Sequence, residues 1–288
     1  MDLSSRVCVV TGATRGIGRA TAEDLGRAGA TLVLVCRRQA DGEEVASGIA
    51  RTNAGPPPMV VEADLSSQKA VRAAADRIRS RFERLHVLIN NAGLIPPRRE
   101  VTVDGVEMQL AVNHLAPFLL TNLLLEPLRR GAPSRVLTVS STTHQGAQID
   151  FDDLQSERTY QADEVYAATK LMNLLFTYEL ARRLAGTGVT ANALHPGAVA
   201  TRLLADYMQT TRVYGASPEQ GADTVIYLAA APEVEGRTGK YFTNRRETRS
   251  SPASYDEGLA RRLWDVSARL TGVSSAGPGR VAEPSRAR

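Results

Sequence analysis

Tyr166 and Lys170 stand four positions apart in the chain. Positions i and i+4 share one face of a helix, so a helix here would place the phenol beside the ammonium group. A nearby positive charge favours phenolate and should lower the tyrosine pKa from about 10 toward neutral pH, where proton transfer is most efficient. Such a pair can supply the proton that carbonyl reduction requires. A solvated lysine beside a half-exposed tyrosine would show the same spacing, but Lys69, Lys170 and Lys240 are the only lysines of this arginine-rich chain.

The composition fits one large soluble α/β domain. The chain has 288 residues, of which 43% are hydrophobic and 23% charged, which places it at the upper edge of a single-core domain. Its net charge of +4 comes from arginines spread among acidic residues, and only 5% of residues are aromatic. A nucleic-acid-binding surface needs a dense basic face with aromatic side chains. We therefore expect a small-molecule partner and no nucleic acid.

The cysteines, the histidines and the amino terminus indicate the compartment of the protein and whether it uses a metal. Cys8 and Cys36 lie in apolar runs, which indicates buried thiols in a reducing compartment. The four histidines lack metal-ligand spacing, so no metal site and no zinc-dependent alcohol dehydrogenase is expected. The first strand begins near Arg6 and leaves no room for a signal peptide or a membrane anchor. We expect a metal-free mechanism in a cytoplasmic protein with no integral membrane segment.

Short apolar runs alternate with segments of helical period. The runs predict strands at residues 7–10, 32–35, 59–61, 87–89, 136–139, 189–194 and 241–242. The other segments predict helices at residues 16–28, 43–52, 68–82, 104–128, 164–184 and 218–231. This alternation predicts a doubly wound parallel sheet, the Rossmann fold, in a single α/β domain over residues 1–273. The composition changes after Val273, so residues 274–288 are expected to form a disordered tail.

A glycine-rich turn follows the first predicted strand and opens a helix. Glycines let the backbone approach a pyrophosphate, while free N–H groups and the helix dipole stabilise its charge. The turn alone is weak evidence, but the strand before it and the helix after it favour a dinucleotide site. The residues expected to bind there are Gly12, Thr14, Arg15, Gly16, Ile17 and Gly18.

Taken with this turn, further motifs in a fixed order resemble the short-chain dehydrogenases/reductases. They are Asp64-Leu65, Asn90-Asn91-Ala92-Gly93, Asn113, Ser141, Tyr166-x-x-x-Lys170 and Pro196-Gly197. The resemblance extends from about residue 5 to 272. A finer likeness to the retinol-dehydrogenase-like branch is carried by residues 104–107, 112–115, 153–155 and 194–197.

The resemblance implies a role for each matching residue. Tyr166 would be the proton donor, and Lys170 would support its phenolate and hold the nicotinamide ribose. Ser141 would bind the substrate oxygen, and Asn113 would position a water of a proton relay. Asp64 would hold the adenine amino group. The remaining cofactor-binding positions would be Leu65, Asn90, Ala92, Gly93, Pro196 and Gly197. The implied reaction is hydride transfer between a nicotinamide cofactor and a carbonyl carbon.

The end of the second predicted strand bears on the choice of cofactor. It reads Cys36-Arg37-Arg38 and lacks the acid that would bind a free ribose 2′-hydroxyl. Arg15 and Arg37 could converge on a 2′-phosphate, because guanidinium groups pair well with phosphate oxygens. We therefore expect NADP(H) rather than NAD(H).

The segment at about residues 198–217 resembles the flexible substrate lid of the family. Its apolar members Val199, Leu203, Leu204, Tyr207 and Met208 suit a bulky lipophilic ketone or aldehyde, although they would also pack an ordinary helix. The arginine-rich composition resembles that of a high-GC bacterium, where such reductases tailor aromatic polyketides for antibiotic biosynthesis. A retinol- or retinal-type dehydrogenase is the alternative, and a noncatalytic NADP-binding regulatory protein is a further one.

Two of the predicted helices bear on assembly. The helices at residues 164–184 and 218–231 resemble the family's dimer surfaces, which suggests a homodimer or homotetramer. Packing inside a monomer would use similar apolar stripes.

Overall fold

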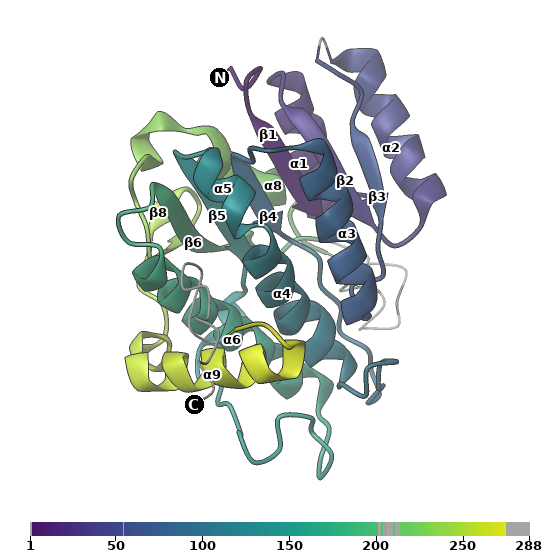
Figure 1. Ribbon diagram of the computed structural model, residues 1–288. Coiled ribbons are helices and arrows are strands. Elements are labelled where there is room, and N and C mark those ends of the chain that lie inside the picture. The colour runs from purple at the N-terminus through teal and green to yellow at the C-terminus, as the bar shows by residue number, and fades with distance from the viewer. Residues whose placement is uncertain are drawn as a thin grey trace, which may run out of the picture.

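A computed structural model of the chain describes residues 2–53, 55–200, 203, 205, 210 and 214–274. Its centre is a sheet in the order β3-β2-β1-β4-β5-β6-β7-β8 (Figure 1). Its strands are β1 (Val7–Thr11), β2 (Thr31–Cys36), β3 (Met59–Glu62), β4 (Val87–Asn90), β5 (Ser134–Val139), β6 (Val189–His195), β7 (Lys240–Thr243) and β8 (Arg246–Glu247). Strands β1 to β7 are parallel, and β8 pairs antiparallel with β7.

Helices cover both faces of this sheet. One face carries α1 (Gly16–Arg27), α2 (Gln39–Thr52) and α8 (Pro218–Ala230). The other face carries α3 (Gln68–Arg81), α4 (Ala116–Leu123), α5 (Leu125–Arg130), α6 (Ala162–Arg183) and α9 (Glu257–Thr271), as Figure 1 shows. The doubly wound α/β fold expected from the sequence is confirmed.

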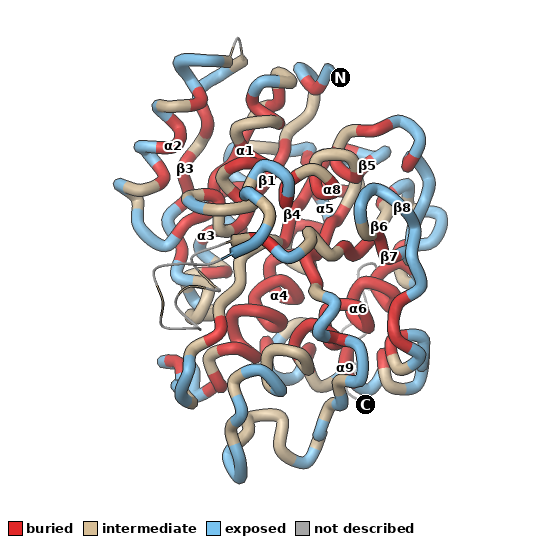
Figure 2. The backbone as a smooth tube through the Cα atoms, turned by 180° about the vertical axis from the view of Figure 1, so that it is seen from behind, coloured by how far each residue is buried: buried red, intermediate tan, exposed pale blue. Residues whose placement is uncertain are grey.

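The two faces explain why the strands are apolar without alternation. Neighbouring residues of one strand point to opposite faces, so Leu88 joins the core under α3, α4 and α6, whereas Ile89 joins the core under α1 and α8. Both side chains are fully buried. In Figure 2 the central strands are mostly buried, while the loops at the rim of the molecule are largely exposed. A sheet covered on both faces positions the residues at its strand ends rigidly.

The single helix predicted over residues 104–128 is wrong. The chain first makes a turn in which Gly105 has a φ of +73°, then a π-helical turn over Leu110–Leu115, and only then α4. Pro117 gives the reason. It has no N–H to donate to the carbonyl of Asn113, four residues earlier, so regular α-helical bonding fails at this point. The irregular turn therefore includes Asn113 itself.

Strand β8 and helix α9 were not predicted. Helix α9 is amphipathic and buries Leu263, Trp264 and Ala268. Its ends are well defined, because the side chain of Asp256 accepts a hydrogen bond from the N–H of Leu259 at 2.9 Å and Gly272 closes the helix with a φ of +64°. The Trp264 ring packs against Phe118 with a centroid distance of 4.9 Å, which fixes α9 onto α4.

The expected substrate lid and tail are described only in part. Val199 forms an isolated parallel bridge with Ala216, so the two ends of the lid segment lie side by side. Leu204, Tyr207 and Met208 lie outside the described residues, as does the tail from residue 275. Within the described part of the chain, no helix has the length and apolar character needed to cross a membrane.

Candidate active site

The residues singled out in the sequence meet at one edge of the sheet. Gly12 follows β1, Asn90 ends β4, Ser141 follows β5 and Pro196 follows β6. These are the carboxyl ends of parallel strands, and the strand order reverses between β1 and β4. Open α/β sheets bind their ligands at such a reversal point. Short stretches that are far apart in the sequence are thereby brought into one site.

The glycine-rich turn has the geometry of a pyrophosphate cradle. Gly12 and Gly16 have φ angles of +67° and +50°, a region that glycine enters without strain. A Cβ at Gly18 would lie 2.3 Å from the Gly12 oxygen, so helix and turn touch closely there. Among the described residues, no side chain caps the first turn of α1, and that turn carries no acid. Its N–H groups suit a bound anion.

Thr11 and Asn91 brace this turn, and both were missed as site residues. The Thr11 hydroxyl accepts hydrogen bonds from the N–H groups of Asn91 and Ala92 at 3.0 and 3.1 Å. The Asn91 amide donates to the carbonyl oxygen of Thr11 at 2.9 Å. The pattern of a hydroxyl residue ending one strand and an Asn-Asn pair ending the next was the available signal. Together they tie the end of β4 to the glycine turn.

The side chain of Asn90 does not line the site. It is buried and donates from Nδ2 to the Thr121 hydroxyl of α4 at 3.0 Å. Asn90 therefore fastens the end of β4 to the helix layer, and the backbone of Ala92 and Gly93 continues along the edge. Asp64 is exposed, and its Oδ1 accepts from the N–H and the hydroxyl of Ser66 at 2.9 and 2.8 Å.

Tyr166 and Lys170 lie on the first turns of α6, as the spacing predicted. The Lys170 side chain is buried, with the residue 3% exposed, and its ammonium group lies 5.2 Å from the centre of the Tyr166 ring. Nζ donates to the Val139 carbonyl at the end of β5 at 3.1 Å. The Ser140 hydroxyl donates to the Lys170 carbonyl at 2.8 Å. The helix is thus fixed to the carboxyl end of β5.

Asn113 connects the helix of Tyr166 and Lys170 to the backbone that follows β4. Its Oδ1 accepts from the N–H of Leu94 and its Nδ2 donates to the Leu94 carbonyl, both at 2.9 Å. Nδ2 also lies 3.3 Å from the Thr169 hydroxyl, which donates to the Tyr166 carbonyl at 2.8 Å. A Cβ at Gly93 would lie 3.4 Å from Asn113 Oδ1 and 3.7 Å from Lys170 Nζ. Gly93 therefore lies directly against Asn113 and the Lys170 ammonium group, and the same Cβ would lie 4.0 Å from Leu203 Cδ1.

Ser141 is held by the short 3₁₀ turn that follows it, Thr142–His144. Its hydroxyl oxygen accepts from the N–H of Thr143 at 3.2 Å. Because that contact uses a lone pair, the hydroxyl proton remains available for donation to a substrate oxygen. The turn packs against α6, the helix of Tyr166 and Lys170.

The pKa of Tyr166 differs from the expectation. Burial raises it to about 12, and burial also lowers the pKa of Lys170 to about 8. The prediction that the lysine lowers the phenol pKa is wrong for the protein alone, because packing removes hydration from both charged forms, with Lys170 buried and Tyr166 half-buried. The ammonium group faces the ring, where it contributes a cation–π contact. Tyr166 is therefore a neutral phenol at physiological pH and has a proton to donate.

The basic residues at the end of β2 also differ in part from the prediction. Arg15 and Arg38 both reach Asp41, at 3.8 and 2.8 Å. Arg37 is exposed, and no ion pair of this residue is found among the described residues. The structure thus brings Arg15 and Arg38 to the same carboxylate, and the convergence of Arg15 and Arg37 on a 2′-phosphate stays a prediction. The Arg38–Asp41 spacing of three residues was the signal for this pairing.

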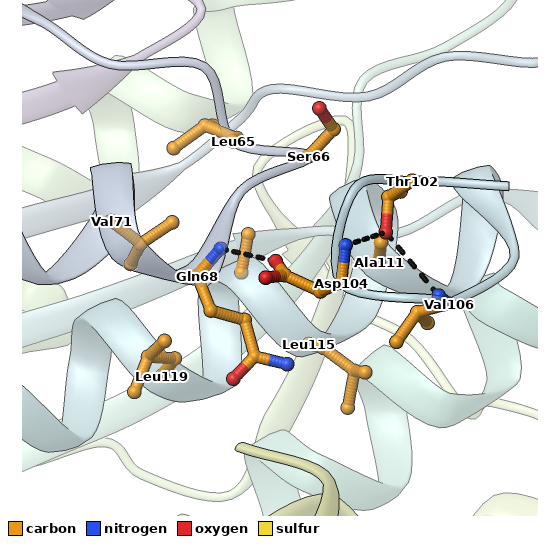
Figure 3. A pocket seen from close by; sticks show the side chains of 11 residues that line it. Leu65, Ser66, Gln68, Val71, Thr102, Asp104, Val106, Ala111, Leu115 and Leu119 are labelled. Atoms are coloured by element: carbon orange, nitrogen blue, oxygen red, sulfur yellow. Dashed lines mark hydrogen bonds between the residues drawn. The ribbon is translucent and has the colours of Figure 1, made fainter.

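A small cavity lies between α3, the turn at residues 102–106 and the helix of Asn113 (Figure 3). Asp104 accepts a hydrogen bond from the N–H of Gln68 at 2.7 Å and closes one side of it. Its volume of about 10 Å³ suits roughly one water molecule. Leu65 is the one predicted cofactor residue in its lining. The cavity is too small for a substrate.

The cradle fits a dinucleotide, and the comparisons with known proteins agree with it. A family profile described as short chain dehydrogenase matches residues 6–212. Human retinol dehydrogenase 14 is 43% identical over 294 residues, covering 94% of this chain and 88% of that protein. Human retinol dehydrogenase 11 is 42% identical over 279 residues, covering 95% of this chain and 88% of that protein.

Solved structures show the same fold. An uncharacterized protein from Mycobacterium paratuberculosis superimposes with a TM-score of 0.79 at 34% identity, covering 94% of this chain and 95% of the other. A short chain dehydrogenase from Burkholderia cenocepacia in complex with NADP gives a TM-score of 0.66 at 26% identity, covering 84% of this chain and 96% of the other. The chain therefore belongs to the short-chain dehydrogenase family, and its curated relatives place it near the retinol dehydrogenases.

Proposed function

We propose that this protein is an NADP(H)-dependent oxidoreductase that interconverts a bulky lipophilic carbonyl compound and the corresponding alcohol. The observation that carries the proposal is the set of contacts that join Tyr166, Lys170, Asn113 and Gly93 beside the sheet edge. Membership of the family supports oxidoreductase chemistry. The names of the relatives favour a retinal-type aldehyde or a retinol-type alcohol as the substrate class.

Each residue of the site has a distinct task in this reaction. NADP(H), when bound, supplies or accepts the hydride. In the direction of reduction Tyr166 donates its phenol proton to the substrate oxygen, and the Ser141 hydroxyl donates a hydrogen bond to the same oxygen as negative charge develops on it. Lys170 stabilises the phenolate left behind. Asn113 holds the backbone at Leu94 and so fixes the segment that follows β4 at the carboxyl edge of the sheet.

The residues of the glycine turn would hold the cofactor. Its pyrophosphate would bind the N–H groups at the start of α1, and Arg15 and Arg37 would be available to a 2′-phosphate. Pro196 and Gly197 follow β6, and the φ of +94° at Gly197 turns the chain toward the lid. The nicotinamide ribose would lie near Gly93 and Lys170.

The names of the relatives favour the retinol-type alternative over tailoring of aromatic polyketides, which is a hypothesis based on composition. A cytoplasmic location and a homodimeric or homotetrameric state stay predictions. A noncatalytic NADP-binding protein is less well supported, because binding alone would not need Asn113, Ser141, Tyr166 and Lys170 as a complete set.

Reduction should slow as the pH rises through about 8, the lowered pKa of Lys170. The lysine is charged below that pH and neutral above it, so its support for the developing phenolate is lost on the alkaline side. The phenol keeps its proton up to about pH 12 and does not limit the reaction earlier. The measurement is kcat/KM for the carbonyl from neutral to alkaline pH. A rate that stays constant well above pH 8 would contradict this role of Lys170.

Arg37→Asp should shift the cofactor preference toward NADH. Loss of a charge-assisted hydrogen bond to phosphate costs about 1.5–3 kcal/mol, so the ratio of kcat/KM for NADPH to that for NADH should fall about 10- to 100-fold. Arg51→Asp is a matched control, because Arg51 is also exposed but lies in the last turn of α2. An unchanged ratio for Arg37→Asp would show that Arg37 does not bind the 2′-phosphate.

A further inference from the structure

We infer that His144 is a positioning residue that holds Ser141 in place for the reaction, an inference that rests on the proposed function. His144 is the last residue of the turn Thr142–His144 that follows the serine, and it is fully buried. It matched none of the motifs in the sequence. The structure shows it bonded at both ring nitrogens.

The two hydrogen bonds of the ring define its protonation state. Nδ1 contacts the carbonyl oxygen of Ser141, and Nε2 contacts the backbone N–H of Ser251 at 3.1 Å. A carbonyl oxygen can only accept and a backbone N–H can only donate. The ring is therefore the neutral tautomer with its proton on Nδ1, donating to Ser141 and accepting from Ser251. Burial lowers the pKa of His144, which agrees with a neutral ring.

The contacts leave Ser141 little freedom. Its carbonyl accepts from the His144 ring and lies 3.3 Å from the His144 N–H. Its hydroxyl oxygen accepts from the N–H of Thr143. Both oxygens of Ser141 are thus fixed from within the same turn, and rotation of the hydroxyl proton is the main freedom that remains. A group that must meet a substrate oxygen benefits from this, because misplacement by about 1 Å can cost 10²-fold in rate.

The far side of the ring is anchored to a segment distant in sequence. Ser251 belongs to the segment 250–255, in which Ser250 and Ser254 share a hydrogen bond of 2.6 Å and Tyr178 of α6 bonds to Ser250 at 2.7 Å. The edge of the Tyr241 ring closes over His144 at a centroid distance of 5.2 Å. The imidazole therefore joins the turn Thr142–His144 to the segment 250–255, and the hydrogen bond between Tyr178 and Ser250 joins that segment to α6.

Packing alone would not require a histidine here. A phenylalanine has a similar shape and would keep the contact with Tyr241, but it would leave the Ser141 carbonyl and the Ser251 N–H without the ring as partner. Buried polar groups without partners are costly. The specific contribution of the imidazole is thus the pair of hydrogen bonds, one of which ends on Ser141.

The first test compares His144→Phe with His144→Asn in the full chain. The phenylalanine should lower kcat for carbonyl reduction about ten-fold, the equivalent of one net hydrogen bond, while the KM for NADPH stays close to the wild-type value. The asparagine keeps a donor near the position of Nδ1 and should recover most of kcat. Thermal melting of each variant shows whether it is folded. A folded His144→Phe with normal kcat would overturn the inference.

The second test combines His144→Phe with Ser141→Ala. If His144 acts through the serine, the phenylalanine should cause no further loss of kcat in the alanine background. Equal losses in both backgrounds would mean that His144 supports only the fold, and would overturn the inference while leaving the proposed function intact. A wild-type protein that reduces no carbonyl compound would instead overturn the proposed function, and the catalytic role of His144 with it.

Discussion

Tyr166→Phe is expected to lower kcat for carbonyl reduction by about 10²- to 10⁴-fold, the range that a positioned general acid contributes. The phenylalanine keeps the ring under the Lys170 ammonium and removes only the hydroxyl, so packing of α6 should not change. NADPH should still bind, which a fluorescence titration can measure. Tyr227→Phe is a matched control, because Tyr227 is a partly buried tyrosine on α8 that lies in the core on the opposite face of the sheet.

The result for Tyr166→Phe distinguishes an oxidoreductase from a noncatalytic NADP-binding protein. Loss of turnover with retained NADPH binding supports proton donation by Tyr166. Turnover near the wild-type value in Tyr166→Phe would contradict the mechanism, because no other described residue has been assigned the proton.

Lys170→Ala is expected to lower kcat/KM about 10²-fold or more and also to weaken NADPH binding. In the proposed mechanism the ammonium group stabilises the phenolate, and it lies beside Gly93, near which the ribose would bind. Both kcat/KM and the affinity for NADPH should therefore fall. Lys69→Ala is a suitable control, since Lys69 is exposed on α3. Normal NADPH affinity in Lys170→Ala would show that the lysine does not contribute to cofactor binding.

Stability provides an independent check on Lys170. Its folded pKa of about 8 lies below the ordinary value of 10.5, so between these values the unfolded chain binds a proton that the folded chain does not. Lys170 should therefore contribute a rise in the free energy of unfolding with pH through this window. Above pH 9 the buried Cys8 thiol opposes this rise, because burial raises its pKa from 9.0 to about 12, so the lysine's contribution is read as the difference between wild type and Lys170→Ala. At neutral pH the buried ammonium is a cost to the fold. Lys170→Ala should show a weaker rise, and loss of activity in this variant should not be explained by unfolding.

Much of the fold could be predicted from local patterns. Apolar runs such as Val7–Val10 and Val136–Val139 have no alternation, which is typical of strands covered on both faces. The helix predicted over residues 104–128 failed because the chain turns at Gly105 and because Pro117 breaks the bonding to Asn113. An apolar pattern does not show where a helix changes its period. Helix α9 carried a readable pattern at Leu263 and Trp264 that was not used.

The sequence motifs indicated which residues lie near one another, but not their energetics. Lys170 bonds to the end of β5 and Asn113 contacts Thr169 of the same helix, while the catalytic roles of Tyr166, Lys170, Asn113 and Ser141 stay a prediction. The pKa of Tyr166 could not be read from spacing, because burial depends on how α6 packs against β5 and the helix of Asn113. For the same reason, the side chain of Asn90 could be located at a strand end but not seen to bond with Thr121.

Supporting contacts were the least predictable. Thr11, Asn91 and His144 act on backbone groups, and a sequence does not reveal which carbonyl or N–H a folded side chain will meet. The pairing of Arg15 with Asp41, which Arg38 also contacts, likewise depends on the approach of two helix ends.

The most direct test of the central claim is NADPH consumption by the purified protein with a panel of lipophilic carbonyl compounds that includes retinal and aromatic polyketide ketones, with Tyr166→Phe measured in parallel. The account predicts steady NADPH oxidation and formation of the alcohol with at least one lipophilic carbonyl, and near loss of both in the variant. Equal rates for wild type and Tyr166→Phe, or tight NADPH binding with no reduction of any member of the panel, would contradict it.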